Sequence, residues 1–454
     1  MSSQKAFFTI LAATFSFFVC QATTPEEHGL TAMSSPFYLE PSVLLTPSRF
    51  DIAAKYIYAK LKEKNVSSTW GHEVYKNHIK AINNFYESSP YKRGIDAFTS
   101  SFHETLMSIK EKGYTRDHLV LPVDANLNPR DGSHRAAACI LYSVWPICRI
   151  YNYAPPVSYI FSDYLVKQEL EEKYADAMAM QYCILKKNTY MVTVTPAAVG
   201  KDAEIKNILN QFGIIVYRKN VLLTWNGTIN FTRLAYKGES WLGTFASNFA
   251  GAQNKASFCF GQDHRKNNPM RVFLFECDSL EKVKLCKQAI RSLFHIQNHS
   301  VHINDTHEQS IEMTQALFVK NSIHFLNHAK PKSFKNFLSC LEQYKCWIKT
   351  NNIDAEDLCI ESGAVLAAYG IRDSGDIDFL HHNLNHTLPK NGKIEDHNKH
   401  HNATERDDII YNPEKHFWFQ GVKFASLKEV KKQKTKGGGP PNKDVLAINT
   451  LLNH

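Results

Sequence analysis

Two aspartates near the C-terminus are spaced for metal chemistry. Asp376 and Asp378 lie two residues apart in an apolar stretch, 360–380, that reads IESGAVLAAYGIRDSGDIDFL. Side chains two apart project from the same face of a β-strand, so these carboxylates should lie close together. They would repel each other unless a cation lay between them. Because Mg²⁺ prefers carboxylates together with phosphate oxygens, the spacing predicts metal-assisted transfer of a phosphate-linked group.

The same stretch resembles the nucleotidyltransferase superfamily that includes DNA polymerase β. The family pattern is a strand, a Gly-Gly or Gly-Ser turn that opens a helix, and Asp-x-Asp on the next strand; the turn here is Ser362-Gly363. Further along, GVKFASLKEVKKQK and NKDVLAINTLL resemble the family's lysine-bearing segment and closing helix. The resemblance covers roughly the last 120 residues.

The resemblance implies roles for these residues. Asp376 and Asp378 would hold Mg²⁺, and Ser362 and Gly363 would contact phosphate. The family usually supplies a third carboxylate from a later strand, and Asp408 is the candidate because Ile-Ile-Tyr at 409–411 is expected to form a strand. The turn order, Ser-Gly, departs from the family. Without a third acid the domain would bind nucleotide and not turn it over.

A second motif lies in the first third of the chain. Residues 131–135, Asp-Gly-Ser-His-Arg, resemble the D-G-x-H-R element of ParB-like and sulfiredoxin-like domains. Gly132 allows close backbone approach, and the helix start beyond it offers free N–H groups. His134 and Arg135 add donors, so we expect Gly132, His134 and Arg135 to bind phosphate. The alternative is an Asp-Gly turn closed by an arginine salt bridge. Ser133 stands where sulfiredoxins carry their catalytic cysteine.

Four other polar groupings are weaker candidates. Residues 299–308 could bind a metal, although a surface loop is the favoured interpretation, and the histidine-rich tract 381–407 is interpreted as a solvated insertion. The stretch 431–443 either grips an anionic substrate or forms a charged loop. A pocket in the middle of the chain could be lined by Lys255, Arg271, Glu276 and Arg291.

These candidates require an α/β (α+β) architecture. Apolar alternation and helical spacing predict a helical and α+β domain over 36–170 and an α/β domain over 171–310. The resemblance at 131–135 implies that the first of these is ParB-like. A mixed-sheet, nucleotidyltransferase-like domain is expected over 311–454. In the middle domain we expect strands at 213–217 and 221–225 to pair.

The N-terminus indicates the secretory pathway. Lys5 precedes an apolar run that ends at Cys20, which is typical of a signal peptide over 1–22. Seven Asn-x-Ser/Thr sequons fit entry into the endoplasmic reticulum and Golgi lumen or secretion. Nine cysteines follow the leader, and we expect some of them to form disulfides there. The net charge of +9 fits an anionic substrate and decides little.

Together these features predict a secreted or lumenal Mg²⁺-dependent transferase. It would move a nucleotidyl or sugar-phosphate group from a nucleotide or nucleotide-sugar to a glycan or other hydroxyl acceptor. The alternatives are a non-catalytic nucleotide- or glycan-binding secreted glycoprotein and a structural extracellular glycoprotein with acids on its surface. Nucleic acid is the partner least expected, and membrane contact is expected only if the leader is retained.

Overall fold

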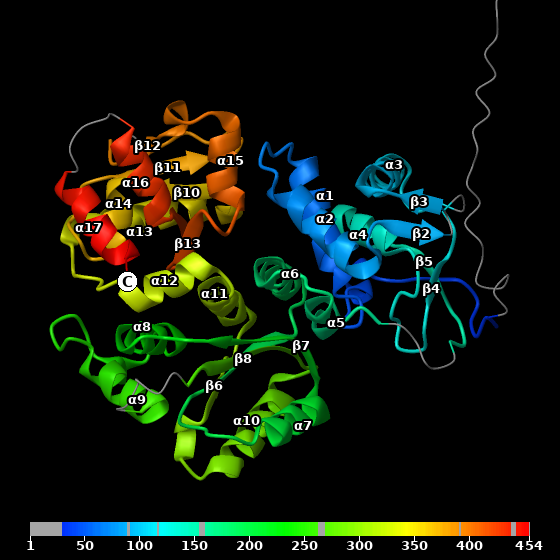
Figure 1. The fold of residues 1–454 in the computed structure, drawn as a ribbon, viewed down its shortest axis with the longest axis horizontal. Helices are drawn as coiled ribbons and strands as arrows, with labels where there is room; N and C mark the ends of the chain where they lie inside the picture. The colour runs from blue at the N-terminus through cyan, green and yellow to red at the C-terminus, as the bar shows by residue number, and fades with distance from the viewer. Residues whose placement is uncertain are drawn as a thin grey trace, which may run out of the picture.

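Three α/β units make up the described part of the chain. The computed structural model describes 30–88, 91–115, 118–153, 159–261, 268–389, 392–436 and 442–453. The expected signal peptide, 1–22, lies outside these residues. Figure 1 shows the three units, with the first at the right, the second below and the third at the upper left. The expected α/β class is confirmed.

The first unit is a small sheet with helices packed beside it. Its strand order is β1-β5-β4, and a two-stranded hairpin, β2-β3, lies next to α3. β4 runs parallel to β5, and α4, which begins one residue after Gly132, packs on α1. The bounds are β1 Phe37–Tyr38, α1 Asp51–Glu63, α2 Trp70–Asn83, β2 Tyr86–Ser88, β3 Tyr91–Arg93, α3 Ile95–Lys112, β4 Leu121–Val123, α4 Ser133–Tyr142 and β5 Ile147–Ile150.

The second unit has a four-stranded sheet in the order β7-β8-β6-β9, all antiparallel. One face is covered by α7 and α10, which share a separate apolar core with the strands. The bounds are α5 Ser162–Lys167, α6 Glu172–Leu185, β6 Thr189–Val194, α7 Asp202–Phe212, β7 Ile214–Val221, α8 Trp225–Ala235, α9 Ala250–Phe260, β8 Met270–Glu276, α10 Leu280–Phe294, β9 Val301–Ile303 and α11 His307–Leu317.

The expected strand pair in this unit is wrong. Residues 214–221 form one long strand, β7, which pairs with β8 and not with 221–225. The chain then turns into α8, whose first N–H groups are capped because the Thr224 hydroxyl accepts a hydrogen bond from Gly227 N. The N-cap threonine was the sequence signal for a helix start at this point.

The third unit has a five-stranded mixed sheet in the order β12-β11-β10-β14-β13. β10 lies at its centre, antiparallel to β11 and parallel to β14, and β12 runs parallel to β11. The bounds are α12 Lys320–His328, α13 Lys335–Thr350, β10 Leu358–Glu361, α14 Gly363–Ala368, β11 Ile377–His381, β12 Ile394–Asp396, α15 Ala403–Tyr411, β13 His416–Phe419, β14 Val422–Ala425, α16 Leu427–Thr435 and α17 Lys443–Leu452.

The expected strand at 409–411 is also wrong, because these residues end helix α15. Asn402 caps that helix: its Oδ1 accepts a hydrogen bond from Glu405 N at 2.9 Å. Within α15, Ile409 and Ile410 are buried. A run of three apolar residues fits either a strand or a buried helix turn, and the cap decides for the helix.

One large apolar core connects all three units. It runs from Leu44 in the first unit through Leu274 in the second to Ile448 in the third. The three units therefore share a continuous apolar core, although each has its own sheet. Within the described part of the chain, no helix combines the length and apolar character needed to cross a bilayer.

Cysteine and sequon positions bear on the expected secretory features. All nine cysteines after the leader are free in the structure, with Cys346 exposed and the other eight buried. The Asn304 side chain is 1% exposed, and its amide nitrogen donates to Thr306 O and to Ser310 Oγ. The amide nitrogens of Asn226 and Asn230 donate to Ala329 O. In the folded chain these three nitrogens are therefore occupied by hydrogen bonds.

Candidate functional site

Three carboxylates form a row across the third sheet. Glu361 on β10 is the direct cross-strand partner of Asp378 on β11, and Asp378 is the partner of Glu395 on β12. Cross-strand partners project from the same face, so the three acids lie side by side. We call Glu361, Asp378 and Glu395 the acidic row. The opposite face of β11 is closed by apolar packing, with Phe379 against Tyr344 and Trp347 of α13.

Histidines from the segment after β12 cover the acidic row. His397 bridges two of its members, since Nδ1 lies 3.0 Å from Glu361 Oε1 and Nε2 lies 3.1 Å from Asp378 Oδ1. The other Glu361 oxygen lies 2.9 Å from His401 Nε2, and Gln433 of α16 donates to Glu361 Oε1 at 3.2 Å. Potential ligand atoms of Asp378, Glu395 and His397 lie within 4.8 Å of one another.

The electrostatics of the row favour a cation. Hydrogen bonds to Asp378 and then to Glu361 raise the pKa of His397 to about 10. Burial alone would raise the pKa of Glu361, which is 2% exposed, but the hydrogen bonds to His397 and His401 lower it. A positively charged imidazolium thus lies between two carboxylates, in the position where a cation best relieves their repulsion.

The structure places the sequence-predicted aspartates differently from the expectation. Asp378 is a member of the acidic row, whereas Asp376 lies just before β11 and accepts a hydrogen bond from Ser374 Oγ at 3.0 Å. The group of clustered ligand atoms consists of Asp378, Glu395 and His397, and neither Asp376 nor Glu361 belongs to it. Asp408 lies on α15, where its Oδ1 accepts from Ser68 Oγ and Asn412 Nδ2. The acids of this site are therefore Glu361, Asp378 and Glu395, and neither Asp376 nor Asp408 is among them.

Sequence reasoning missed Glu361, Glu395 and His397. Glu361 was visible as the last residue of the expected strand, directly before the Ser-Gly turn. Only strand register shows that it faces Asp378. The histidine-rich tract, interpreted as a solvated insertion, is in part folded onto the sheet: His382 is buried, and His397 and His401 hold Glu361. That interpretation was wrong for these three histidines.

The Ser362-Gly363 turn follows Glu361 directly. Ser362 has φ 61° and ψ −130°, a backbone conformation that favours glycine, and it occupies the N-cap position of α14 without a side-chain capping hydrogen bond. A Cβ added at Gly363 would lie 3.0 Å from Ser374 Oγ and 3.5 Å from Arg372 Nη2, so a guanidinium lies beside the turn. Arg372 is held by Asp444 of α17, with Nε 3.0 Å from Oδ1.

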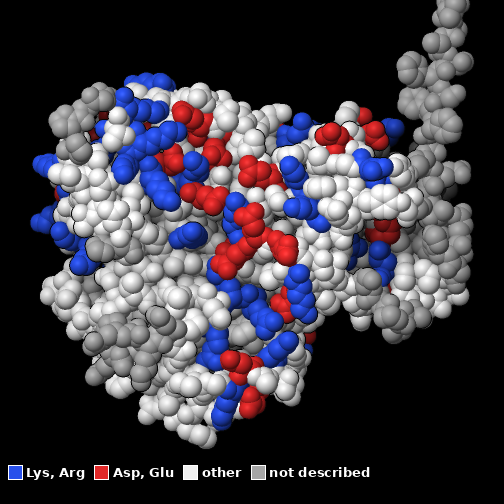
Figure 2. All heavy atoms as spheres, in the orientation of Figure 1, with Lys and Arg blue, Asp and Glu red and all other residues white. Residues whose placement is uncertain are grey.

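A basic helix adjoins the acidic row. Lys431, Lys432 and Lys434 lie on α16, the helix that reaches Glu361 through Gln433. Figure 2 shows lysine and arginine gathered at the upper left, over the part of the molecule where α16 and α17 lie, with acidic side chains beside them. The expectation of a charged loop at 431–443 is wrong for 431–435, which is helical, and 437–441 lies outside the described residues.

The D-G-x-H-R element lines a cavity in the first unit. This cavity has a volume of about 540 Å³, within the range of roughly 300–1,000 Å³ found for ligand pockets. Its walls carry five Lys or Arg side chains and three acids: Arg49, Lys55, Lys92, Arg130, Arg135, Asp51, Glu87 and Asp131. Figure 1 places β4 and α4 far from β10–β12, so this cavity and the acidic row are separate sites.

A buried charge triad lies in the wall of this cavity. Asp51 Oδ1 lies 2.9 Å from Arg49 Nε, and Asp51 Oδ2 lies 2.5 Å from Lys55 Nζ. Burial alone would raise the pKa of Asp51, but Arg49 and then Lys55 lower it far below its usual value. Two buried cations share one buried carboxylate, so the triad carries an excess positive charge that a bound anion would neutralise.

The three expected phosphate ligands line this cavity and also make contacts within the chain. Gly132 has φ 74° and precedes α4, and an added Cβ would collide with Leu121 and Arg135. His134 Nε2 lies 2.8 Å from the Tyr75 hydroxyl, and burial keeps the pKa of His134 well below its usual value. Arg135 donates to Leu119 O and lies 3.5 Å from Asp131. His134 is thus a neutral, internally bonded side chain, and Arg135 matches the arginine salt-bridge alternative.

The side chains of the two remaining groupings take part in separate contacts among the residues that the structure describes. In 299–308, His302 lies on β9 beside the Tyr236 ring, and His307 bonds to Cys183 O, while Thr306 caps α11. In the middle unit, Lys255 bonds to Asn298 and Arg271 to Asp202. Glu276 accepts from Tyr182 and Asn188 on another side of the sheet. These side chains serve separate local contacts.

Comparisons with protein-family models, with curated proteins and with solved structures find no match for this chain. The functional argument therefore rests on the geometry of the acidic row and of the cavity in the first unit.

Proposed function

We propose that the third unit is a divalent-metal-dependent transferase of a nucleotidyl or sugar-phosphate group. The observation that carries this proposal is the cross-strand row of Glu361, Asp378 and Glu395 directly beside the Ser362-Gly363 turn. A strand, a turn into a helix and an acidic second strand follow one another as the nucleotidyltransferase resemblance implies. In this proposal Glu361 takes the part that the sequence analysis assigned to Asp408.

The donor set fits a divalent cation held by carboxylates. Glu361 and Asp378 would be the ligands, because His397 already bridges them as a cation does. The imidazole nitrogen of His397 is a better ligand for Mn²⁺ or Zn²⁺ than for Mg²⁺, so Mg²⁺ binding would require His397 to move aside. When bound, the metal would polarise a phosphoryl oxygen and neutralise charge on the transferred group.

The chain supplies cations for the phosphates of the donor. Arg372 lies beside Gly363, and Lys431, Lys432 and Lys434 lie on the helix that contacts Glu361. Guanidinium and ammonium groups form charge-assisted hydrogen bonds to phosphate oxygens. A donor with a diphosphate or triphosphate could therefore extend from the turn toward α16.

The acceptor would be a hydroxyl group. Its oxygen attacks the phosphorus of the donor, a new P–O bond forms, and the bond to the leaving phosphate-bearing group breaks. Glu395 is the exposed member of the row, so we assign it to accept the hydroxyl proton. The expected leader and the sequons indicate a secretory compartment, and a glycan is the acceptor that we predict there.

A second candidate function is nucleotide or phosphate binding without turnover in the cavity of the first unit. It is favoured by the buried excess charge of Arg49 and Lys55 over Asp51 and by the cavity volume of about 540 Å³. It corresponds to the non-catalytic alternative predicted from the sequence. Both candidates need an anionic ligand, but they place it in different units.

Calorimetric titration with Mn²⁺ and Mg²⁺, each with and without a panel of nucleotides and nucleotide-sugars, tests the primary proposal. Glu361→Gln and Asp378→Asn should each weaken metal binding by about tenfold or more, since each removes one charged ligand. Asp408→Asn is the matched control, because that carboxylate bonds to Ser68 and Asn412. Asp376→Asn distinguishes the acidic row from the Asp376–Asp378 pair predicted from the sequence. If the acidic row is the metal site, this variant should bind metal nearly as well as the wild type does.

The outcomes are distinct. If all four variants bind metal as the wild type does, the acidic row is not a metal site. If Asp376→Asn and Asp378→Asn both abolish metal binding while Glu361→Gln does not, the pair predicted from the sequence is correct and the acidic row is wrong. If nucleotide binds equally to wild type, Glu361→Gln and Asp378→Asn, and Lys92→Met weakens it, the cavity of the first unit is the nucleotide site.

A further inference from the structure

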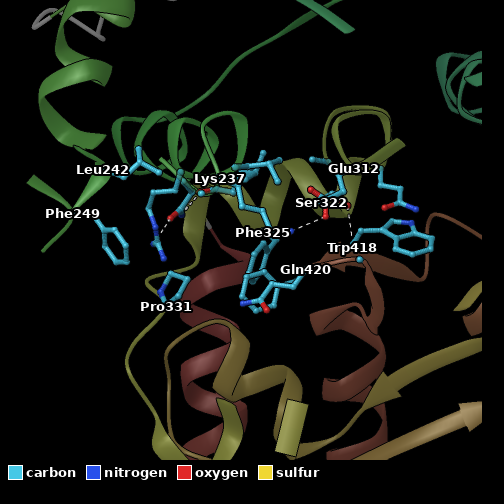
Figure 3. A pocket seen from close by; sticks show the side chains of 18 of the residues that line it. Lys237, Leu242, Phe249, Glu312, Ser322, Phe325, Pro331, Trp418 and Gln420 are labelled. Atoms are coloured by element: carbon cyan, nitrogen blue, oxygen red, sulfur yellow. Dashed lines mark hydrogen bonds and ion pairs between the residues drawn. The ribbon is translucent and has the colours of Figure 1, made fainter. Parts of the chain in front are cut away.

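A cavity between the second and third units has no role in the proposed transfer. It has a volume of about 590 Å³, which suits a drug-sized molecule. Its walls come from α8, the segment 237–249 that follows it and α11 on one side, and from α12, α13 and the β13–β14 turn on the other. Figure 3 shows Leu242 and Phe249 on one side of the cavity and Phe325 and Gln420 on the other, with Pro331 near its edge.

The walls are apolar and aromatic over much of their area. Phe325 is 4% exposed and stacks on Phe417, and Trp418 is 6% exposed. Leu242 and Leu326 add aliphatic surface. An apolar molecule would gain roughly 25 cal/mol for each Å² of its surface that such walls cover. This part of the cavity therefore suits the body of an organic ligand.

One cation in the cavity lacks a carboxylate partner. Arg233 lies on α8 with its guanidinium 3.7 Å from the Phe249 ring centroid and 5.6 Å from that of Phe245. Its Nη1 donates to Asn230 Oδ1 at 3.3 Å, and among the described residues Arg233 forms no ion pair. Burial lowers the pKa of Arg233 to about 10. Four of its five N–H donors are thus left without a described acceptor.

The other charges of the cavity are mostly neutralised. Lys237 Nζ lies 2.8 Å from Glu312 Oε1, and Lys345 Nζ lies 2.9 Å from Glu342 Oε1. Glu239 is exposed, so water screens its charge. Arg233 is therefore the unbalanced charge inside the cavity, and it is positioned where an anion would bind.

Arg233 is also held in place. The Asn230 amide nitrogen donates to Leu326 O and Ala329 O, each at 2.8 Å, so Asn230 links α8 to the end of α12. The same side chain accepts the hydrogen bond from Arg233. A guanidinium fixed by aromatic stacking and by an anchored amide loses little entropy when it binds a ligand.

We propose that this cavity binds an amphipathic organic anion. Its carboxylate, sulfonate or phosphate group would lie on Arg233, and its aromatic or aliphatic body would lie against Phe325 and Leu242. Such a ligand would contact the second and third units at once. The proposal does not depend on the transferase site, because no residue of the acidic row lines the cavity.

Fluorescence titration of the full chain with anilinonaphthalene sulfonate and with phenylnaphthylamine tests whether the cavity binds an amphipathic anion. The two probes share their rings, but only the first carries an anion. We expect one saturable site per chain for each probe. Arg233→Met should weaken the sulfonate by about tenfold, the cost of one charge-assisted hydrogen bond, and leave the neutral probe within about twofold. Ala316→Phe, which fills the cavity, should weaken both probes.

Arg218→Met is the matched control, because Arg218 is paired with Asp163 on the surface and lies outside the cavity. It should bind both probes as the wild type does. Equal sulfonate affinity in wild type and Arg233→Met would overturn the assignment of the anion to Arg233. Undiminished binding of both probes to Ala316→Phe would overturn the cavity itself. The neutral probe also reports whether Arg233→Met retains the fold.

Discussion

At the residue scale, the protonation state of the buried His78 is set by its surroundings. His78 on α2 is fully buried, and neither ring nitrogen has hydrogen-bond geometry to a described group. Burial and then Lys55 lower the pKa of His78 to about 3, although the negative charge of Asp51 acts to raise it. His78 is therefore neutral in the folded chain at neutral pH, and it contributes no charge to the nearby Arg49–Asp51–Lys55 triad.

This predicts that His78 makes the protein acid-sensitive. The folded-state pKa lies below the unfolded value, so His78 costs nothing above about pH 6.5 and destabilises the fold as the pH falls toward about 3. Between pH 7.5 and pH 5 the loss from this group should be about 2 kcal/mol. His78→Leu should abolish this part of the pH dependence of the free energy of unfolding, which urea unfolding at both pH values measures.

The control for this prediction is His386→Leu, because His386 is exposed. A surface change of this kind should alter stability by less than about 0.5 kcal/mol at either pH. An unchanged pH dependence in His78→Leu would show that His78 is not the group responsible.

At the element scale, the turn between β10 and α14 is strained. Ser362 adopts a positive φ of 61° with ψ −130°, where a side chain costs roughly 1–3 kcal/mol. The turn directly follows Glu361 and lies beside Arg372. Strain next to a row of potential ligands fits the proposed transferase site, in which this turn would hold the backbone close to a bound phosphate.

Ser362→Gly should therefore stabilise the protein. Relief of strain is offset in part by the greater freedom of glycine in the unfolded chain, which leaves a gain of roughly 1 kcal/mol. Ser362→Ala is the matched control: it keeps the Cβ, so its stability should stay within about 0.5 kcal/mol of wild type. Equal stabilisation by both variants, read from denaturant midpoints, would assign the effect to the hydroxyl and not to the backbone.

At the scale of the whole molecule, a buried joint connects the first and third units. Asp407 is fully buried, accepts a hydrogen bond from Ser67 N at 2.8 Å and lies 3.1 Å from His382 Nδ1. The other nitrogen of His382 lies 2.8 Å from Lys64 O. The loop between α1 and α2 is thereby tied to α15, and the shared apolar core passes nearby.

Asp407→Ala should loosen this joint. It leaves Arg406, His382 and Ser67 N without their common acceptor, which for a buried network costs about 3–5 kcal/mol. In scanning calorimetry we expect unfolding to begin at a lower temperature than in the wild type. We also expect two transitions in place of one, because the first and third units would then unfold separately. Lys64→Met is the comparison: the ion pair of Lys64 with Asp357 is partly exposed and should contribute less than about 1 kcal/mol.

A single, unshifted transition in Asp407→Ala would show that the apolar core alone couples the units. If the unfolding temperature of Lys64→Met falls as far as that of Asp407→Ala, the surface ion pair of Lys64 connects the two units as strongly as the buried carboxylate does.

Much of the local structure follows from local sequence. β-Branched and aromatic residues predict the strand β6, and helical spacing with Gly213 as a stop predicts α7. The failures at 221–225 and 409–411 occur where a short apolar run is compatible with both strand and helix. In both places a capping residue, Thr224 or Asn402, favoured the helix.

The sequence by itself determined the α/β class, the strand that carries Asp378 and the turn before it, because alternation and turn chemistry act over a few residues. Only the tertiary structure decided which acids meet. The pairing of β10, β11 and β12 brings Glu361 and Glu395 to Asp378 across 34 residues of chain, from 361 to 395. Register between strands depends on the packing of the whole sheet, so no local pattern could have selected these partners.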